Sequence, residues 1–165
     1  MKKVAMFCFA LGLLCMGYAV TVFAAQAEGS VYTNDRYGFS LNLPPGHTSV
    51  TEPENGDGII VTYGDGMVLR AYGALTPIVL GMDCAAIYEY AKTSFNEVTY
   101  ARLNDAESWL ALSGYKDGKV FYLKKFVGKS ADYTVEMEYP KEKIELFNTF
   151  VKRVVGSFTP GDMTQ

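Results

Sequence analysis

The sequence of 165 residues is poor in cysteine and histidine, with three cysteines and one histidine. It has no paired Cys/His spacing of the kind that binds structural zinc, so we expect no metal site. It also lacks the glycine-rich nucleotide-binding motifs and the G-x-S-x-G turn of many hydrolases. We therefore expect no catalytic residues and no cofactor.

An excess of basic residues is missing as well. The chain has 15 Lys and Arg residues against 18 Asp and Glu, a net charge of −3, which does not favour a nucleic-acid-binding surface. Hydrophobic residues make up 49% of the chain and aromatic residues 14%, which excludes a disordered protein. The length fits one domain.

Residues 1–27 have the pattern of a secretory signal peptide. Two lysines precede an uncharged run from Val4 to Val22, and small residues allow cleavage after Ala24 or Ala27. Removal leaves residues 28–165 as a single domain with thirteen basic and eighteen acidic residues, a net charge of −5. The alternative is an uncleaved anchor, because the run approaches the roughly 20 residues that span a bilayer.

The clearest pattern lies between residues 107 and 156. We expect three strands, Glu107–Tyr115, Lys119–Val127 and Ala131–Tyr139, with a hairpin turn at Asp117-Gly118. The third strand alternates between apolar and polar residues, which predicts that its polar face contacts water. The first two strands are apolar on both faces, so we expect both faces of these strands to be covered.

Two amphipathic helices are predicted. One runs from Cys84 to Phe95, capped by Asp83, with Met82 packing across the cap. The other follows Pro140 and ends at Gly156. The apolar face of this second helix should pack on a sheet and contains Ile144, Leu146, Phe147, Phe150, Val151, Val154 and Val155.

Short strands fill the rest of the chain. We expect them at Tyr37–Leu43, Thr48–Thr51, Ile59–Tyr63, Met67–Tyr72 and Val98–Leu103. Strands joined by short turns, together with two helices, predict an α+β fold. Its sheet should be largely antiparallel and flanked by the two main helices.

The candidate reactive residues are few. His47 follows the turn Pro44-Pro45-Gly46, which favours a solvated loop residue over a general base or a metal ligand. Cys8 and Cys15 lie in the predicted signal peptide, so Cys84 would be the only cysteine left. Its place on the apolar helix face favours a buried thiol over a nucleophile or an intermolecular disulfide.

Two acidic turns were considered as cation sites. The loop from Glu52 to Gly58 and the turn Gly64-Asp65-Gly66 both carry oxygen ligands beside glycines. The EF-hand spacing and its closing glutamate are missing, which favours plain turns over calcium sites.

Tyrosine is unusually frequent, with eleven of the twelve tyrosines downstream of the signal segment. The ordinary explanation is that tyrosine favours β-strands and lies at the edges of the core. If tyrosines gather with Trp109 around a concavity, the site would suit a protein or glycan partner. A basic hairpin, expected to be a solvated face, contains Lys116, Lys119, Lys124, Lys125 and Lys129.

Residues 32–46, YTNDRYGFSLNLPPG, resemble the opening of PsbP-like domains: a short strand, an aromatic-Gly-Phe-Ser strand and a Pro-x-Gly turn. The later order of strands and helices is similar too, whereas His47 stands where many relatives have tryptophan. The resemblance implies an antiparallel sheet flanked by helices and a non-catalytic binding or assembly role. It places no metal ligand on this chain.

We therefore expect an exported, non-enzymatic protein of the periplasm, cell envelope or extracellular space. It would bind a protein partner or a small ligand and, once the signal is removed, neither membrane nor nucleic acid. One alternative is an exported hydrolase of envelope polymers, which would use His47 or a carboxylate pair from Glu54, Asp57, Asp105 and Glu107. Another is a structural protein that keeps residues 4–22 as an anchor.

Overall fold

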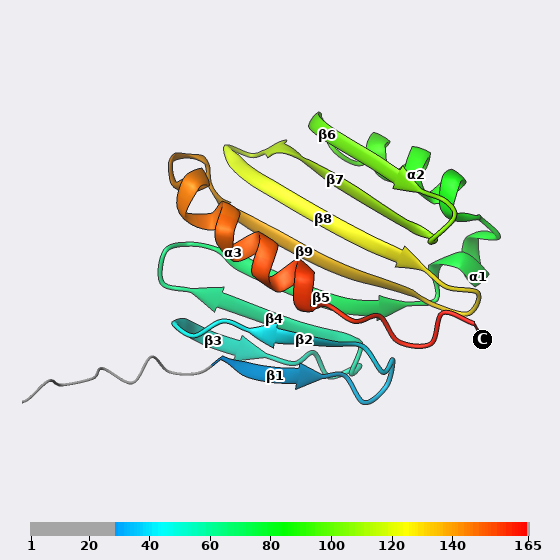
Figure 1. The fold of residues 1–165 in the computed structure, drawn as a ribbon, viewed down its shortest axis with the longest axis horizontal. Helices are drawn as coiled ribbons and strands as arrows, with labels where there is room; N and C mark the ends of the chain where they lie inside the picture. Colours follow the sequence, from blue (N-terminus) through cyan, green and yellow to red (C-terminus); the bar gives the residue numbers. More distant parts are fainter. Residues whose placement is uncertain (1–28, 165) are drawn as a thin grey trace, which may run out of the picture.

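The computed structural model describes residues 29–164, so the predicted signal peptide and its cleavage sites lie outside the described residues. Its centre is a seven-stranded antiparallel sheet of strand order β3-β4-β5-β9-β8-β7-β6 (Figure 1). The strands of this sheet are β3 (His47–Thr51), β4 (Gly58–Tyr63), β5 (Val68–Ala74), β6 (Glu97–Asn104), β7 (Trp109–Lys116), β8 (Lys119–Val127) and β9 (Asp132–Pro140). The remaining elements are β1 (Ser30–Thr33), β2 (Ser40–Leu43), α1 (Thr76–Leu80), α2 (Cys84–Thr93), a short 3-10 turn (Lys141–Lys143) and α3 (Ile144–Ser157).

The sheet is covered differently on its two faces. On one, called here the α3 face, α3 and the β1–β2 hairpin pack over β4, β5 and β9 (Figure 1). On the other, the α2 face, α2 packs over β6, β7 and β8. This architecture confirms the predicted α+β fold with an antiparallel sheet and two main helices.

The predicted hairpin turn is confirmed. Asp117 and Gly118 have φ angles of 51° and 76°, as a type I′ turn between twisted strands requires. β8 has the predicted bounds, and β7 and β9 differ from theirs by one or two residues.

The burial predicted for these strands is wrong. β9 is the central strand, and its polar residues Asp132 and Thr134 are fully buried instead of facing water. β7, predicted to be covered on both faces, leaves Trp109, Ser113 and Tyr115 partly exposed on the α3 face. Strand order, which the alternation of one strand does not reveal, decides which faces are covered.

The helices are close to their predicted places. Asp83 caps α2 by accepting a hydrogen bond from the Ala86 N–H at 2.8 Å. The predicted apolar side of α2 packs on the sheet, and Met82 packs beside it. α3 buries Phe147, Val151 and Val154 as expected.

Two details of α3 are corrected. Leu146, expected in the core, is exposed, and Ile144 is exposed at the start of the helix. The helix also continues through Gly156 to Ser157. The Ser157 hydroxyl donates to the Val154 carbonyl at 2.9 Å and accepts from the Asn42 N–H at 3.0 Å. This side chain joins the helix end to β2, so a glycine cap is not needed there.

The N-terminal part departs most from expectation. The predicted strand Tyr37–Leu43 is a strand only from Ser40, because the buried Asn34 accepts a hydrogen bond from the Tyr37 N–H at 2.8 Å and closes a turn. β1 and α1 were not predicted from residue patterns. Within residues 29–164, no helix is long and apolar enough to cross a bilayer.

Candidate functional site

Three neighbouring strands bring aromatic and basic side chains together on the α3 face. Cross-strand pairing forms three rows, each running from β6 through β7 to β8. The rows are Tyr100-Ser113-Tyr122, Arg102-Ala111-Lys124 and Asn104-Trp109-Phe126. We call these nine residues the aromatic–basic grid.

Two basic side chains of the grid lie over the ring of Trp109. The Arg102 guanidinium lies 5.2 Å and the Lys124 ammonium 4.7 Å from the centroid of its ring. Lys124 is also 4.7 Å from the centre of the Phe126 ring. Cations over aromatic rings at these distances are attracted to them, the more so when partly desolvated. Trp109 thus holds two cations in place.

Glu107 is the carboxylate beside Trp109 and Lys124. The Trp109 indole N–H donates to Glu107 at 2.8 Å. Burial lowers the pKa of Lys124, an effect that the Glu107 carboxylate opposes and Arg102 slightly reinforces. Lys124 thus presents a cation that has already lost part of its water shell.

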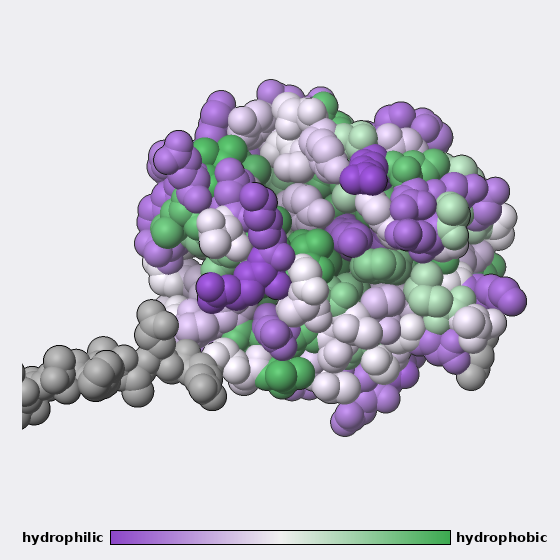
Figure 2. Space-filling model, viewed as in Figure 1, coloured by the Kyte–Doolittle hydropathy of each residue, from purple (hydrophilic) through white to green (hydrophobic). Residues whose placement is uncertain are grey.

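The grid is only partly covered by the rest of the chain. Tyr100 is 47% exposed, Arg102 is exposed, and Trp109, Tyr122 and Lys124 are half-buried. Figure 2 shows this side, where hydrophilic and intermediate colours mix with apolar patches in the region beside α3. Aromatic residues and arginine are enriched in protein interfaces, and such anchors carry much of the binding energy.

Tyr100 and Tyr122 lie on the same face of the sheet as Trp109, but the row Arg102-Ala111-Lys124 separates them from it. Other tyrosines serve the core: Tyr63, Tyr133 and Tyr139 are buried. The basic hairpin does not form one solvated face. Lys124 lies on the α3 face, while Lys125 points to the α2 face and pairs with the buried Asp132.

His47 does not lie in a loop but begins β3. It is exposed, and its ring meets that of Tyr63 edge-on at 6.2 Å. Among residues 29–164 there is no group of three or more His, Cys, Asp or Glu side chains placed to hold a metal ion.

The candidate carboxylates fall into two separate loops. Glu54 and Asp57 lie before β4, and Asp105 and Glu107 lie before β7. Four strand spacings separate β4 from β7, about 19 Å at ~4.8 Å each, beyond the separations used in glycoside hydrolysis. The two loops therefore do not bring their carboxylates together.

The acidic turns are held by basic side chains. One Arg36 nitrogen donates to the Asn55 carbonyl and to the Asp57 carboxylate, both at 2.6 Å. In the other turn, Asp65 pairs with Lys143 at 2.7 Å. Oxygen atoms considered for a cation thus contact guanidinium and ammonium groups.

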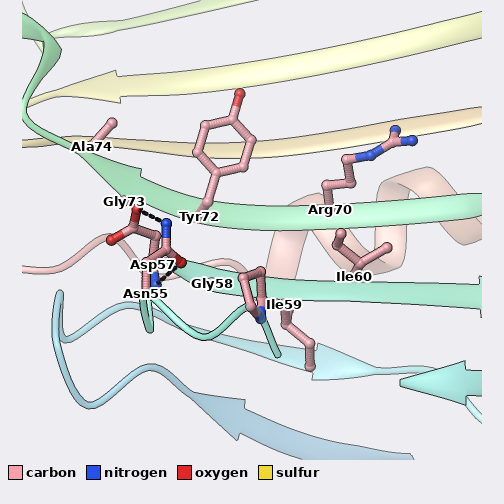
Figure 3. A pocket seen from close by; sticks show the side chains of 10 residues that line it. Asn55, Asp57, Gly58, Ile59, Ile60, Arg70, Tyr72, Gly73 and Ala74 are labelled. Atoms are coloured by element: carbon pink, nitrogen blue, oxygen red, sulfur yellow. Dashed lines mark hydrogen bonds between the residues drawn. The ribbon is translucent and has the colours of Figure 1, made fainter. Parts of the chain in front are cut away.

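A pocket of about 260 Å³ lies over β4 and β5. Figure 3 shows Arg70 and Tyr72 projecting from β5 to the same side, with Asn55 and Asp57 at the far wall. Arg70 is 3.6 Å from both Glu136 and Glu138. Asp57 is paired with Arg36, whereas the buried Nη1 of Arg70 donates no hydrogen bond among the described residues.

Cys84 is buried, as the sequence predicted. Burial, with smaller contributions from Asp105 and Asp83, raises the pKa of its thiol to about 11. Since the thiolate is the reactive form, the Cys84 thiol of the folded protein should be inert at pH 8.

We predict that iodoacetamide at pH 8 alkylates Cys84 at least tenfold more slowly in the native protein than in urea. Mass spectrometry of the Cys84 peptide measures this residue separately from Cys8 and Cys15. Equal rates in the two conditions would contradict the buried, protonated thiol.

Trp109 and Lys124 stand out in the sequence, but their nearness to Arg102 does not. The missing information is the register of β6, which contains a bulge between Val98 and Tyr100. Arg102 comes to face Ala111 and approach Trp109 only because of that register. The alternation of Tyr100 and Arg102 is the one local signal that could have been used.

No protein-family model matches the chain, and no curated protein sequence matches it. Among solved structures it is similar to the cyanobacterial PsbP protein, CyanoP, of Synechocystis sp. PCC 6803, with a TM-score of 0.58 and 14% identity over 88% of this chain and 98% of that one. A second is LpqN, a protein involved in cell envelope biogenesis of Mycobacterium tuberculosis, at a TM-score of 0.49 and 14% identity, covering 81% of this chain and 86% of that one. The likeness to CyanoP confirms the PsbP-like fold that residues 32–46 implied.

Proposed function

We propose that this chain, which has a PsbP-like fold, is an exported, non-catalytic module that docks a protein partner through the aromatic–basic grid. The supporting observation is Trp109, half-exposed and flanked by two cations on a rigid antiparallel sheet. Export is supported by the signal pattern of residues 1–27.

The chemistry of the grid favours a partner with acidic side chains. Arg102 and Lys124 lie near Trp109 with Glu107 as the neighbouring carboxylate, in a chain whose overall charge is negative. A local basic region on an acidic protein orients an acidic partner toward it. An open surface of three strands also suits a protein better than a small ligand, which binds in concave sites.

A photo-crosslinking residue in place of Ser113 tests the docking surface. The full-length gene is expressed in its native cell, and the same residue in place of Thr51, exposed on β3, is the control. We expect one protein to be cross-linked from position 113 and not from position 51. Equal cross-linking from both positions, or none from 113, would contradict the proposal.

The partner identified in this way then allows a direct measurement. Trp109→Ala and Lys124→Glu should each weaken its binding by roughly thirtyfold, the effect of losing an interface residue worth about 2 kcal/mol. Lys119→Glu changes the same charge on an exposed residue of the same hairpin, outside the grid. It should leave the affinity nearly unchanged, and equal losses in all three variants would place the docking surface elsewhere.

A further inference from the structure

β6 is an open edge of the sheet. It pairs with β7 alone, and along its other side no strand of residues 29–164 is hydrogen-bonded to it. It is eight residues long, and natural edge strands are commonly protected by short length, by charged side chains, by proline or by a β-bulge. β6 (Glu97–Asn104) contains neither lysine nor proline, but it has one acidic residue, one arginine and a bulge, so any strand that pairs with it has to match these features.

The side chains of β6 form a self-complementary pattern around its bulge. Glu97 and Arg102 lie on the α3 face, opposite Tyr115 and Ala111 of β7. Val98 and Ala101 lie on the α2 face, opposite Gly114 and Leu112. Because of the bulge between Val98 and Tyr100, residues at equal distances on either side of the point between Thr99 and Tyr100 lie on the same face of the sheet. Glu97 thus matches Arg102, and Val98 matches Ala101.

From this pattern we infer that a second copy of the chain pairs with β6, antiparallel, around a two-fold axis between Thr99 and Tyr100. In this register Glu97 of each copy lies opposite Arg102 of the other, and Val98 lies opposite Ala101. Each cross-strand pair of opposite charge or apolar residues is worth roughly 0.2–1 kcal/mol, and the two-fold axis makes each occur twice. The backbone groups of the edge are satisfied at the same time.

Other two-fold registers are worse. An axis through Arg102 places the two arginines directly opposite each other, and like charges in that position are destabilising. An axis through Ala101 places Val98, on the α2 face, against Asn104, on the α3 face, so the faces no longer match. The favoured register is the one that pairs the charges.

The other sheet edge lacks this complementarity. β3 (His47–Thr51) is five residues long and contains no acidic residue and no lysine or arginine. Two copies joined at β6 would instead form one continuous sheet with their grids side by side on the α3 face. This inference goes beyond the proposed function: pairing at β6 uses Arg102, whose guanidinium also lies over Trp109, and leaves Trp109 and Lys124 on the inner strands for another partner.

Charge exchange tests the pairing directly. The protein is expressed from its full-length gene, and sedimentation velocity is measured from micromolar to millimolar concentration. We expect the unchanged chain to dimerise, and Glu97→Arg or Arg102→Glu to remain monomeric over the range in which the unchanged chain is a dimer. The double variant, with both charges exchanged, should dimerise again, because the pairs are restored with opposite polarity.

Glu145→Arg, on the exposed side of α3, is the matched control for charge reversal and should leave dimerisation unchanged. Circular dichroism confirms that each variant is folded. A monomer at every concentration, or a dimer that both single variants leave intact, would overturn the inference. Glu97 lies outside the grid, so loss of the dimer in Glu97→Arg with cross-linking from position 113 retained leaves the proposed function standing, and the two can fail separately.

Discussion

Replacing Lys125 by methionine is expected to lower the free energy of unfolding by about 3–5 kcal/mol, because it leaves a buried carboxylate without its counter-charge. Asp132 is fully buried, and Lys125, itself largely buried, forms an ion pair with one of its oxygens. Urea denaturation, followed by circular dichroism, measures the loss.

The matched control is Lys129→Met. Lys129 is exposed and lies in the connection between β8 and β9. It should change the stability by less than about 0.5 kcal/mol. Replacing both members of the pair, Lys125→Met with Asp132→Leu, should recover much of the loss, since a buried ion pair can often be exchanged for apolar residues. If Lys125→Met were as stable as the control, the pair would not be buried in solution.

Phe121→Ala is expected to destabilise the protein by about 3–5 kcal/mol, the usual cost of deleting a buried phenylalanine. Phe121 is 1% exposed on the α2 face, and its ring stacks on Phe95 with centroids 4.0 Å apart and an interplanar angle of 11°. The same substitution removes the ring stacking between β8 and Phe95, in the segment that follows α2. Alkylation of Cys84 should therefore become faster in this variant.

Tyr90→Ala provides the comparison, because Tyr90 is on α2, the helix that packs against Phe121, but is itself 60% exposed. Its effect on the urea midpoint should be small. A loss for Tyr90→Ala equal to that for Phe121→Ala would mean that the orientation of α2 on the sheet is different from the one described.

Local sequence signals were sufficient for the meander and the helices. The Asp117-Gly118 turn determines the pairing of β7 with β8 residue by residue, and the spacing of Phe147, Val151 and Val154 identifies the buried side of α3. Both signals act between residues close in the chain. The overall α+β architecture follows from them and from the PsbP-like opening.

Contacts between segments that are far apart in the chain could not be predicted from local residue patterns. The polar alternation of β9 is typical of a strand wet on one side, yet β5 and β8 enclose it and Lys125 neutralises Asp132. Likewise, the nearness of Arg102 to Trp109 depends on a bulge that no residue pattern marked. The fold was therefore more predictable than the grid.

The central position of β9 has a consequence for the order of events during synthesis. β5 pairs with β4 early, but its second neighbour, β9, is complete only when residues 132–140 have been made, some sixty positions later in the chain. Contacts so distant in sequence form slowly, and the unpaired strands are prone to aggregate in the meantime. A nascent chain that stops before β9 has two half-sheets, β3-β4-β5 and β6-β7-β8, with no strand to join them. Delaying the collapse of the chain until the whole polypeptide has been made would therefore protect the most vulnerable stage of its folding.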